Sequence, residues 1–219
     1  MYAIAIDGPS ASGKGAVSDR LSEKLGILHL NSGALYRAVG YFALQNGISI
    51  DDGDAILKAI KSHKVSVRYE NGIQITLLDG VDINDKLYTA DVTVASAHVS
   101  KHPGLREFVL GTQLEIAKSH SLVLEGRDIT SVVLPNAKYK FFLDASLEER
   151  AKRRYKDFIK RGEPMTLEEV TKRLAERDYI DKTRTVSPLV RVKDAIYIDT
   201  TSMSVDEVVE KILSYIKEK

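Results

Sequence analysis

Cysteine and tryptophan are absent from this chain of 219 residues, and it contains no long apolar run. Without cysteine, disulfides, a thiolate nucleophile and cysteine-based zinc sites are all excluded. No apolar run approaches the ~20 residues that a membrane-spanning helix needs. The chain opens on a short apolar strand pattern rather than on a signal segment. These absences predict a cytoplasmic protein with no membrane partner.

An excess of either charge is also missing, since 32 Lys and Arg residues stand against 31 Asp and Glu residues. The resulting formal net charge of +1 argues against nucleic acid as a partner. The chain length and the 43% of hydrophobic residues suit one well-buried core with small insertions.

The most informative segment lies near the N-terminus, where an apolar run at 2–6 precedes a glycine-rich loop and a helical pattern. Gly8, Gly13 and Lys14 have the spacing of a phosphate-binding P-loop. Glycine lets backbone amides approach a phosphate closely, and the helix dipole adds to the lysine charge. An incidental turn is the alternative. The predicted nucleotide-binding residues are Gly8, Pro9, Ser10, Ala11, Ser12, Gly13, Lys14, Gly15 and Ala16.

Four further apolar runs, at 27–30, 122–124, 140–143 and 195–198, are predicted strands separated by helical patterns. Polar residues stand at the C-terminal end of each run. Ser/Thr-x-x-Glu patterns starting at Ser146, Thr166 and Ser204 predict capped helix starts. The alternation predicts an α/β fold with a five-stranded parallel sheet flanked by helices. Ligands are expected beyond the C-terminal ends of its strands.

Residues 64–94 break this alternation. Two runs of period two, at 64–69 and 73–77, flank Asn71-Gly72, which is a strong hairpin signal, and Asp79-Gly80 suggests a second turn. We therefore expect a small inserted antiparallel β lobe. It is either decoration or a mobile lobe that binds the acceptor.

A run of basic residues follows the third of these strand patterns. It is either a solvated helix face or a short helical lid whose guanidinium groups close over a transferred phosphoryl group. Its members are Arg150, Lys152, Arg153, Arg154, Lys156, Lys160 and Arg161.

The motifs that carry the strongest resemblance lie at residues 6–10, 13–15, 31–37, 125–128, 142–146 and 176–178, with Asp181, Arg184 and 188–189. In this order they resemble the bacterial cytidylate (CMP) kinase family, a branch of the nucleoside monophosphate kinases. The resemblance implies a fold of the P-loop kinase type. It also implies transfer of the γ-phosphoryl group of ATP to CMP or dCMP, giving CDP or dCDP and ADP, with Mg²⁺ as cofactor.

The resemblance further implies how charge is distributed. Lys14 would reach the β- and γ-phosphates of ATP, and Arg37 and Arg127 would hold the acceptor phosphate. Because the second ionisation of a phosphate lies near ~6, the attacking oxygen is already anionic, and cations rather than a general base are needed. The five histidines are assigned no role. The implied catalytic residues are Lys14, Arg127, Arg150, Arg153 and Arg154.

The resemblance also implies a pyrimidine site. Cytosine presents an amino donor beside two acceptors, which a carboxylate at Asp128 and the guanidinium groups of Arg106 and Arg184 would complement. Uracil would leave such groups unpaired, at roughly 1–3 kcal/mol each. The implied acceptor-binding residues are Ser32, Tyr36, Arg37, Arg106, Arg127, Asp128, Arg177, Asp181 and Arg184.

Each of these assignments has a structural alternative. Arg177, Asp181 and Arg184 have the spacing of a salt-bridge ladder on a helix surface. Asp128 has the alternative of an N-cap or turn residue, and Arg106 that of an arginine snorkelling from a surface helix.

Three positions depart from the family pattern. Ala16 stands where a hydroxyl for Mg²⁺ is usual, and Ser18 is turned roughly 200° away on a helix. No residue is therefore assigned as a metal ligand, and Mg²⁺ is expected on phosphate oxygens and water. Asn31 replaces a usual aspartate. Ala97 replaces a sugar-contacting serine, with Ser96 one place off, which leaves ribose against deoxyribose open.

We expect three parts in a monomer: a P-loop core (1–37, 101–147 and 185–219), an inserted acceptor-binding lobe (38–100) and a lid with its following helix (148–184). Two other functions remain open. One is a P-loop kinase for another monophosphate or for a small-metabolite hydroxyl, with Asp128 as its base. The other is a nucleotide sensor or GTP-dependent switch, although a guanine-reading Asn-Lys-x-Asp element is absent.

Overall fold

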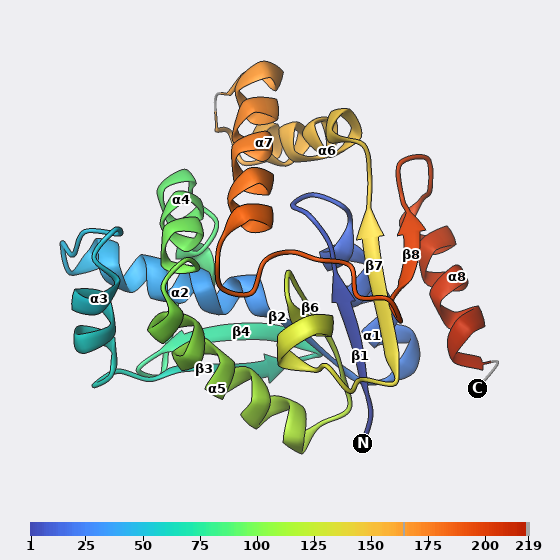
Figure 1. Ribbon diagram of the computed structural model, residues 1–219, viewed down its shortest axis with the longest axis horizontal. Coiled ribbons are helices and arrows are strands. Elements are labelled where there is room, and N and C mark those ends of the chain that lie inside the picture. The colour runs from blue at the N-terminus through green and yellow to red at the C-terminus, as the bar shows by residue number, and fades with distance from the viewer. Residues whose placement is uncertain (164, 218–219) are drawn as a thin grey trace.

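Five parallel strands form the central sheet, in the spatial order β2-β6-β1-β7-β8 (Figure 1). The computed structural model describes residues 1–163 and 165–217, so residues 164, 218 and 219 of the predicted lid and core ranges lie outside it. Strand β1 pairs with β6 on one side and with β7 on the other. The strands are β1 (Ala3–Asp7), β2 (Leu28–Asn31), β6 (Leu122–Gly126), β7 (Tyr139–Asp144) and β8 (Ile196–Asp199).

Helices cover both faces of this sheet, because alternate side chains of each strand point to opposite faces. Ile4 and Ile6 of β1 pack with α1 (Lys14–Leu25) and α8 (Val205–Lys217) on one face. On the other face, Ala5 packs with a cluster that draws on α5 (Pro103–Ser119) and the short π-helical segment η2 (Ile129–Val133). The predicted α/β sheet flanked by helices is confirmed, with strand boundaries shifted by one or two residues.

A second, antiparallel sheet has the order β3-β4-β5 and comprises β3 (Val65–Glu70), β4 (Ile73–Leu78) and β5 (Val81–Asp82). Asn71 and Gly72 join its first two strands with φ values of 51° and 80°, as a two-residue hairpin turn of this hand requires. The predicted hairpin is therefore confirmed. The amide of Gln74 binds the backbone of Asn31, so β4 is tied to the end of β2.

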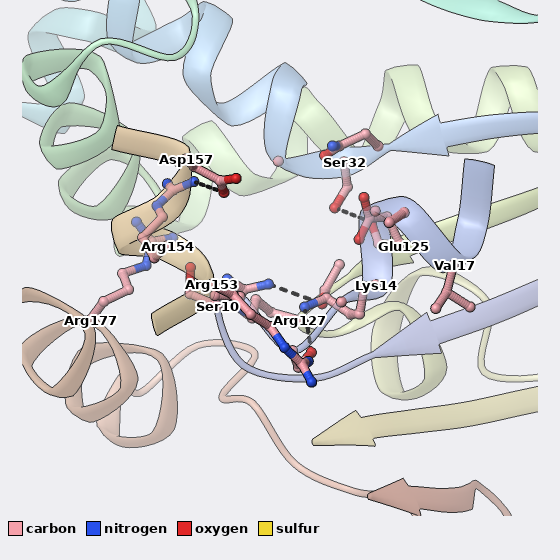
Figure 2. Close-up of a pocket in the computed structure, with 18 of the residues that line it drawn as sticks. Ser10, Lys14, Val17, Ser32, Glu125, Arg127, Arg153, Arg154, Asp157 and Arg177 are labelled. Atoms are coloured by element: carbon pink, nitrogen blue, oxygen red, sulfur yellow. Dashed lines mark hydrogen bonds and ion pairs between the residues drawn. The ribbon is translucent and has the colours of Figure 1, made fainter. Parts of the chain in front are cut away.

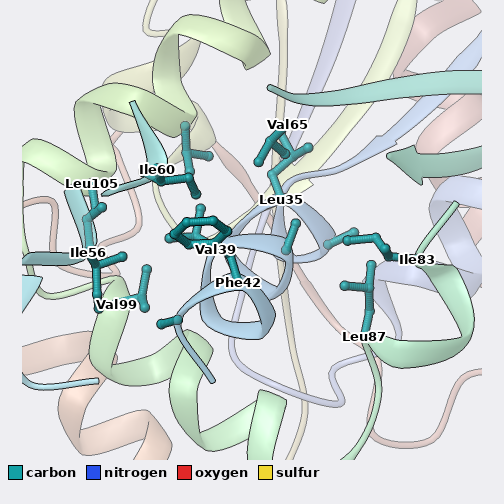
Figure 3. Close-up of a cluster of buried hydrophobic side chains, with 14 residues drawn as sticks. Leu35, Val39, Phe42, Ile56, Ile60, Val65, Ile83, Leu87, Val99 and Leu105 are labelled. Carbon is teal, nitrogen blue, oxygen red and sulfur yellow. The ribbon is translucent and has the colours of Figure 1, made fainter. Parts of the chain in front are cut away.

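A separate hydrophobic cluster joins this sheet to the helices around it (Figure 3). Its centre is α2 (Ser32–Gln45), whose Leu35, Val39 and Phe42 face inward. The other contributing elements are α3 (Gly53–Ile60), β3, the 3₁₀ turn η1 (Asn84–Lys86) with its flanking residues, α4 (Ala90–Val99) and α5. The small sheet therefore packs on a core of its own.

The basic run forms a helix rather than a loop. Helices α6 (Leu147–Lys160) and α7 (Leu167–Thr183) pack through Ala151, Phe158, Val170 and Leu174 and stand beyond the C-terminal end of β7 (Figure 1). Thr166 has its complete capping box with Glu169. No helix in the described ranges combines the length and apolar character that crossing a bilayer would require.

Candidate active site

A cavity of about 630 Å³ opens beyond the C-terminal ends of the parallel strands, between the P-loop, helices α2 and α4, and the lid helices α6 and α7 (Figure 2). Its size lies within the range typical of small-molecule sites. The predicted site residues among its lining are Ser10, Ala11, Ser12, Gly13, Lys14, Gly15, Ala16, Ser32, Tyr36, Arg37, Arg106, Arg127, Asp128, Arg153, Arg154, Arg177 and Arg184.

The P-loop owes its shape to the absence of a side chain at Gly8. A Cβ there would lie 1.9 Å from the carbonyl oxygen of Leu143, so no other residue fits without moving β7. Lys14 follows at the start of α1, and its Nζ donates to the carbonyl of Pro9 at 2.7 Å. Lys14 is only 5% exposed. Burial, followed by repulsion from Arg127, lowers the pKa of Lys14 to about 7.

The turn after β8 binds the P-loop and the lid together. Oγ1 of Thr200 lies 3.0 Å from the Ser12 carbonyl, to which it donates. Arg153 of α6 donates to Thr200 Oγ1 at 3.2 Å and to the Thr200 carbonyl at 2.6 Å. A Cβ on Gly13 would lie 3.6 Å from Arg153 Nη1, so this guanidinium group lies over the loop. Glu149 pairs with Arg153 at 3.0 Å, and in the N-cap of α6 only the Ser146 half of the predicted box forms.

Four arginines from three parts of the chain line the part of the cavity that faces the P-loop. Arg37 comes from α2. Arg127 follows β6, and Arg154 and Arg177 come from the lid (Figure 2). Burial, followed by the nearby charge of Arg154, lowers the pKa of Arg37 to about 9. Burial also lowers the pKa of Arg154. Cations crowded so closely favour the binding of an anion between them.

Asp181 is the carboxylate behind these arginines. Its oxygens lie 2.8 Å from Arg127 Nε, 3.2 Å from Arg177 Nε and 3.6 Å from Arg184 Nη1. Although burial opposes its charge, the three arginines hold the pKa of Asp181 well below its usual range. The predicted ladder of Arg177, Asp181 and Arg184 thus exists, but the Asp181 side chain is fully buried instead of lying on a helix surface.

A second charged pair forms the far end of the cavity. Arg106 and Asp128 are both buried, and the guanidinium Nη2 of Arg106 donates to Asp128 Oδ2. Arg106 Nη1 also donates to the Ser100 carbonyl at 3.0 Å, and its guanidinium carbon lies 5.3 Å from the ring centre of Tyr36. This rules out a snorkelling Arg106. Asp128 stands at the N-cap of η2, but its side chain makes no capping hydrogen bond.

Gly8, Pro9, Arg150 and Asp181 are predicted site residues that lie outside the lining of this cavity. Arg150 is buried beneath it, where it pairs with Asp178 at 2.7 Å and donates to the Ser10 carbonyl at 3.2 Å. Its partners occupy the guanidinium group, so Arg150 supports the P-loop from behind. Asp181 is also buried behind the cavity, where it pairs with Arg127, Arg177 and Arg184.

Other lining residues were not expected from the sequence. Ser96 lines the cavity, and its hydroxyl lies 3.5 Å from Arg177 Nη1, whereas its neighbour Ala97 is not part of the lining. Tyr88 and Thr93 contribute from the segment around the start of α4. Apolar lining comes from Met203, Val205 and Val208 next to Thr200. The lining includes no residue of β3, β4 or β5 in the described part of the chain.

Glu125 is the least expected of these residues, because it depends on a histidine to which the sequence assigns no role. Its Oε1 lies 3.4 Å from His29 Nε2, and Asp19 binds His29 Nδ1 at 2.6 Å. Burial opposes the charge of His29, but the two carboxylates outweigh it and raise the pKa of His29 to about 9. His29 therefore favours the ionised form of Glu125, whose Oε1 would lie 3.4 Å from a Cβ on Gly15.

Metal ligands are scarce at this site. In the described residues, no three His, Asp or Glu side chains are grouped to hold a metal ion. Ala16 is exposed to the cavity and offers no hydroxyl, and Ser18 is fully buried. Glu125 lies beside the P-loop at Gly15. A single nearby carboxylate is compatible with a Mg²⁺ ion that keeps most of its water ligands and is otherwise coordinated by phosphates.

Comparison with known proteins adds independent information. The model of the family described as Cytidylate kinase matches residues 4–218. The chain is 43% identical over 216 residues to a cytidylate kinase of Geobacillus sp. (strain WCH70), covering 99% of this chain and 96% of the relative. It is 42% identical to a cytidylate kinase of Ligilactobacillus salivarius (strain UCC118), with the same coverage of both chains.

Solved structures of similar fold include an uncharacterized protein from Eubacterium ventriosum, with a TM-score of 0.52, 13% identity and full coverage of both chains. A sugar kinase from Janibacter sp. HTCC2649 matches with a TM-score of 0.50 and 13% identity, covering 99% of this chain and 95% of that one. At such low identity these two likenesses concern the fold alone.

Proposed function

The chain belongs to the cytidylate kinase family, and on that premise we propose how the residues of its cavity transfer the γ-phosphoryl group of ATP to CMP. The enzyme is a nucleoside monophosphate kinase that phosphorylates CMP, and its P-loop binds the donor nucleotide. The division of labour among its side chains, the metal and the second substrate dCMP are proposals. The observation that carries the roles of the side chains is the convergence of Lys14 and seven arginines of the described chain on one cavity.

The acceptor phosphate binds to Arg37 and Arg127, between the P-loop and the lid. Its attacking oxygen needs no base, since a phosphate monoester is already largely dianionic at neutral pH. The barrier arises from bringing two polyanions together, and fixed cations lower it by charge stabilisation and alignment for in-line transfer. Arg154 supplies further charge from the lid, and Lys14 exchanges the Pro9 carbonyl for donor phosphates.

The triphosphate of ATP lies along residues 8–16, with Arg153 above it. The apolar side chains of Met203, Val205 and Val208 next to this end suit the donor base. Arg150 is a positioning residue, because its bond to the Ser10 carbonyl fixes the loop rather than the phosphate.

The cytosine ring lies against Arg106, Asp128 and Arg184, with Ser32 and Tyr36 beside it. A carboxylate next to guanidinium groups matches the amino donor and the acceptors of cytosine. Arg184 Nη2 is buried without a hydrogen-bond partner in the described chain, which leaves a donor for the base. Arg177 and Ser96 face the sugar, with Asp181 behind them. The Ser96 hydroxyl can bond the 3′-hydroxyl that CMP and dCMP share, so we propose both as acceptors.

If Mg²⁺ is bound with ATP, it would supply charge neutralisation at the donor phosphates. We propose that phosphate oxygens and water would hold it, with Glu125 near that water shell. His29 keeps Glu125 ionised and in place. We propose that the enzyme is a monomer, and ATP as donor supports a cytoplasmic enzyme. Residues 38–100 then form the acceptor lobe and 148–184 the lid.

A coupled assay of ADP release against CMP, dCMP, UMP, AMP and a buffer blank tests the assignment of the base site. We expect turnover with CMP and dCMP and a weaker response to UMP. Asp128→Asn should narrow the ratio of kcat/KM between CMP and UMP by about 10- to 100-fold, since each mismatched buried polar group costs roughly 1–3 kcal/mol. Asp91→Asn, at an exposed carboxylate of α4 outside the cavity lining, is the matched control for that ratio. An unchanged ratio in Asp128→Asn would refute the proposed base site.

A further inference from the structure

Tyr88 lies on the rim of the cavity, between η1 and α4. Its neighbours hold it in place from both sides. Leu87 is fully buried in the cluster of Figure 3, and the Thr89 side chain accepts the backbone N–H of Val92 to start α4. The backbone on both sides of Tyr88 is therefore fixed in the inserted lobe, and the half-buried ring is held from that backbone.

Two arginines from different parts of the chain lie against this ring. The guanidinium carbon of Arg37, from α2, is 5.3 Å from the ring centre. The guanidinium carbon of Arg161, at the C-terminal end of lid helix α6, is 5.4 Å from the same centre. Both distances lie within the range of cation–π contacts. Arg161 Nη1 also donates to the Tyr88 carbonyl at 3.1 Å, so the lid touches this residue twice.

Arg37 has little else to fix its orientation. In the described part of the chain its Nη1 donates to the Gly33 carbonyl at 3.3 Å, its Nε has no hydrogen-bond partner, and no carboxylate pairs with it. The face of an aromatic ring favours a cation and restricts the plane of a guanidinium group. The Tyr88 ring is thus the contact that best defines how Arg37 is presented to the cavity.

We propose that Tyr88 is a positioning residue that links the lid to the acceptor-phosphate site: its ring orients Arg37, and Arg161 holds that ring when the lid lies over the cleft. The proposal rests on the binding of the acceptor phosphate by Arg37. The tyrosine hydroxyl has no part in it, because the ring face and the backbone carbonyl make the contacts. Loss of either partner therefore weakens binding of the phosphate rather than of the nucleoside.

Titration calorimetry with CMP and with cytidine, together with steady-state kinetics, tests this link. Tyr88→Leu should weaken CMP binding about tenfold and leave cytidine binding unchanged, whereas Tyr88→Phe should stay within about twofold of the parent. Arg161→Met should raise the KM for CMP about two- to fivefold with little change in kcat. Arg173→Met, an exposed arginine on α7, is the matched control.

The double variant of Tyr88→Leu and Arg161→Met decides the coupling. Its loss of CMP affinity should be smaller than the product of the two single losses, because each single change already breaks the contact between Arg161 and the Tyr88 ring. A full product, an equal loss for cytidine, or an Arg161→Met enzyme indistinguishable from Arg173→Met would each overturn the role of Tyr88. If Tyr88→Leu fails to fold, the exposed Arg161→Met variant settles the question on its own. A parent enzyme that binds CMP no better than cytidine would instead overturn the proposed phosphate site at Arg37.

Discussion

Asp181→Asn removes a buried carboxylate that pairs with three arginines. The native carboxylate has no exposed side-chain area and lies 2.8 to 3.6 Å from Arg127, Arg177 and Arg184. Breaking a buried ion pair from one side costs about 3–5 kcal/mol, because the remaining charge stays buried and unpaired. At about 2–4 °C per kcal/mol for a chain of this size, the melting temperature should fall by about 6–20 °C.

The pH dependence of this stabilisation follows from the direction of the pKa shift. Because the folded pKa of Asp181 lies below its unfolded value, the carboxylate stabilises the fold fully at neutral pH. That contribution is lost only as the pH falls below the usual range of an aspartate. The melting difference between the parent and Asp181→Asn should therefore be constant from about pH 6 to 8 and shrink in acid.

Melting curves with and without ligand make the assay specific. CMP brings a phosphate dianion to Arg127, one of the three arginines around Asp181, and should recover part of the lost stability in Asp181→Asn, whereas cytidine should not. Asp157→Asn is the control, since its side chain is 51% exposed, 3.9 Å from Arg154, and worth at most about 1 kcal/mol. If Asp181→Asn melts as close to the parent as Asp157→Asn does, the reasoning about a buried charge hub is refuted.

Three further outcomes are expected. His29→Gln should destabilise the protein most below about pH 6.5, and the charge-dependent part of this loss should disappear above about pH 10. The reason is that the stabilisation by a histidine with a pKa near 9 is lost as the pH rises through that value. A pH-independent difference in melting temperature would contradict this. ATP binding should take up protons above pH 7, since donor phosphates favour the charged form of Lys14; calorimetry in two buffers of different ionisation enthalpy measures it, and Lys14→Met should abolish it. Ala16→Thr should lower the Mg²⁺ concentration for half-maximal activity several-fold, and an unchanged Mg²⁺ titration would rule out a metal-ligand deficit at this position.

Local signals explain why much of this molecule is readable from its sequence. Gly8, Gly13 and Lys14 define the P-loop within the short segment 8–14. Asn71-Gly72 defines a hairpin turn whose geometry depends only on these two residues. The position of the cavity beyond the C-terminal ends of the strands follows from the general layering of α/β folds.

What the sequence conceals depends on residues far apart in the chain. Arg150 belongs to a basic run and reads as a lid cation, yet Asp178 and the Ser10 carbonyl draw it beneath the loop. His29 shows no pattern at all, because its partner Glu125 is 96 residues away and meets it only across paired strands β2 and β6. Such contacts follow from tertiary packing, which no local spacing encodes.

The bond between Thr200 and Ser12 joins residues 188 positions apart. The ribosome makes the segment of Ser12 well before that of Thr200. During synthesis the P-loop is therefore present well before the Thr200 hydroxyl that hydrogen-bonds to it. Ribosome-bound fragments that end before Thr200 should leave the Ser12 carbonyl without this donor, so this support of the loop forms only after β8 and the turn that follows it have been made.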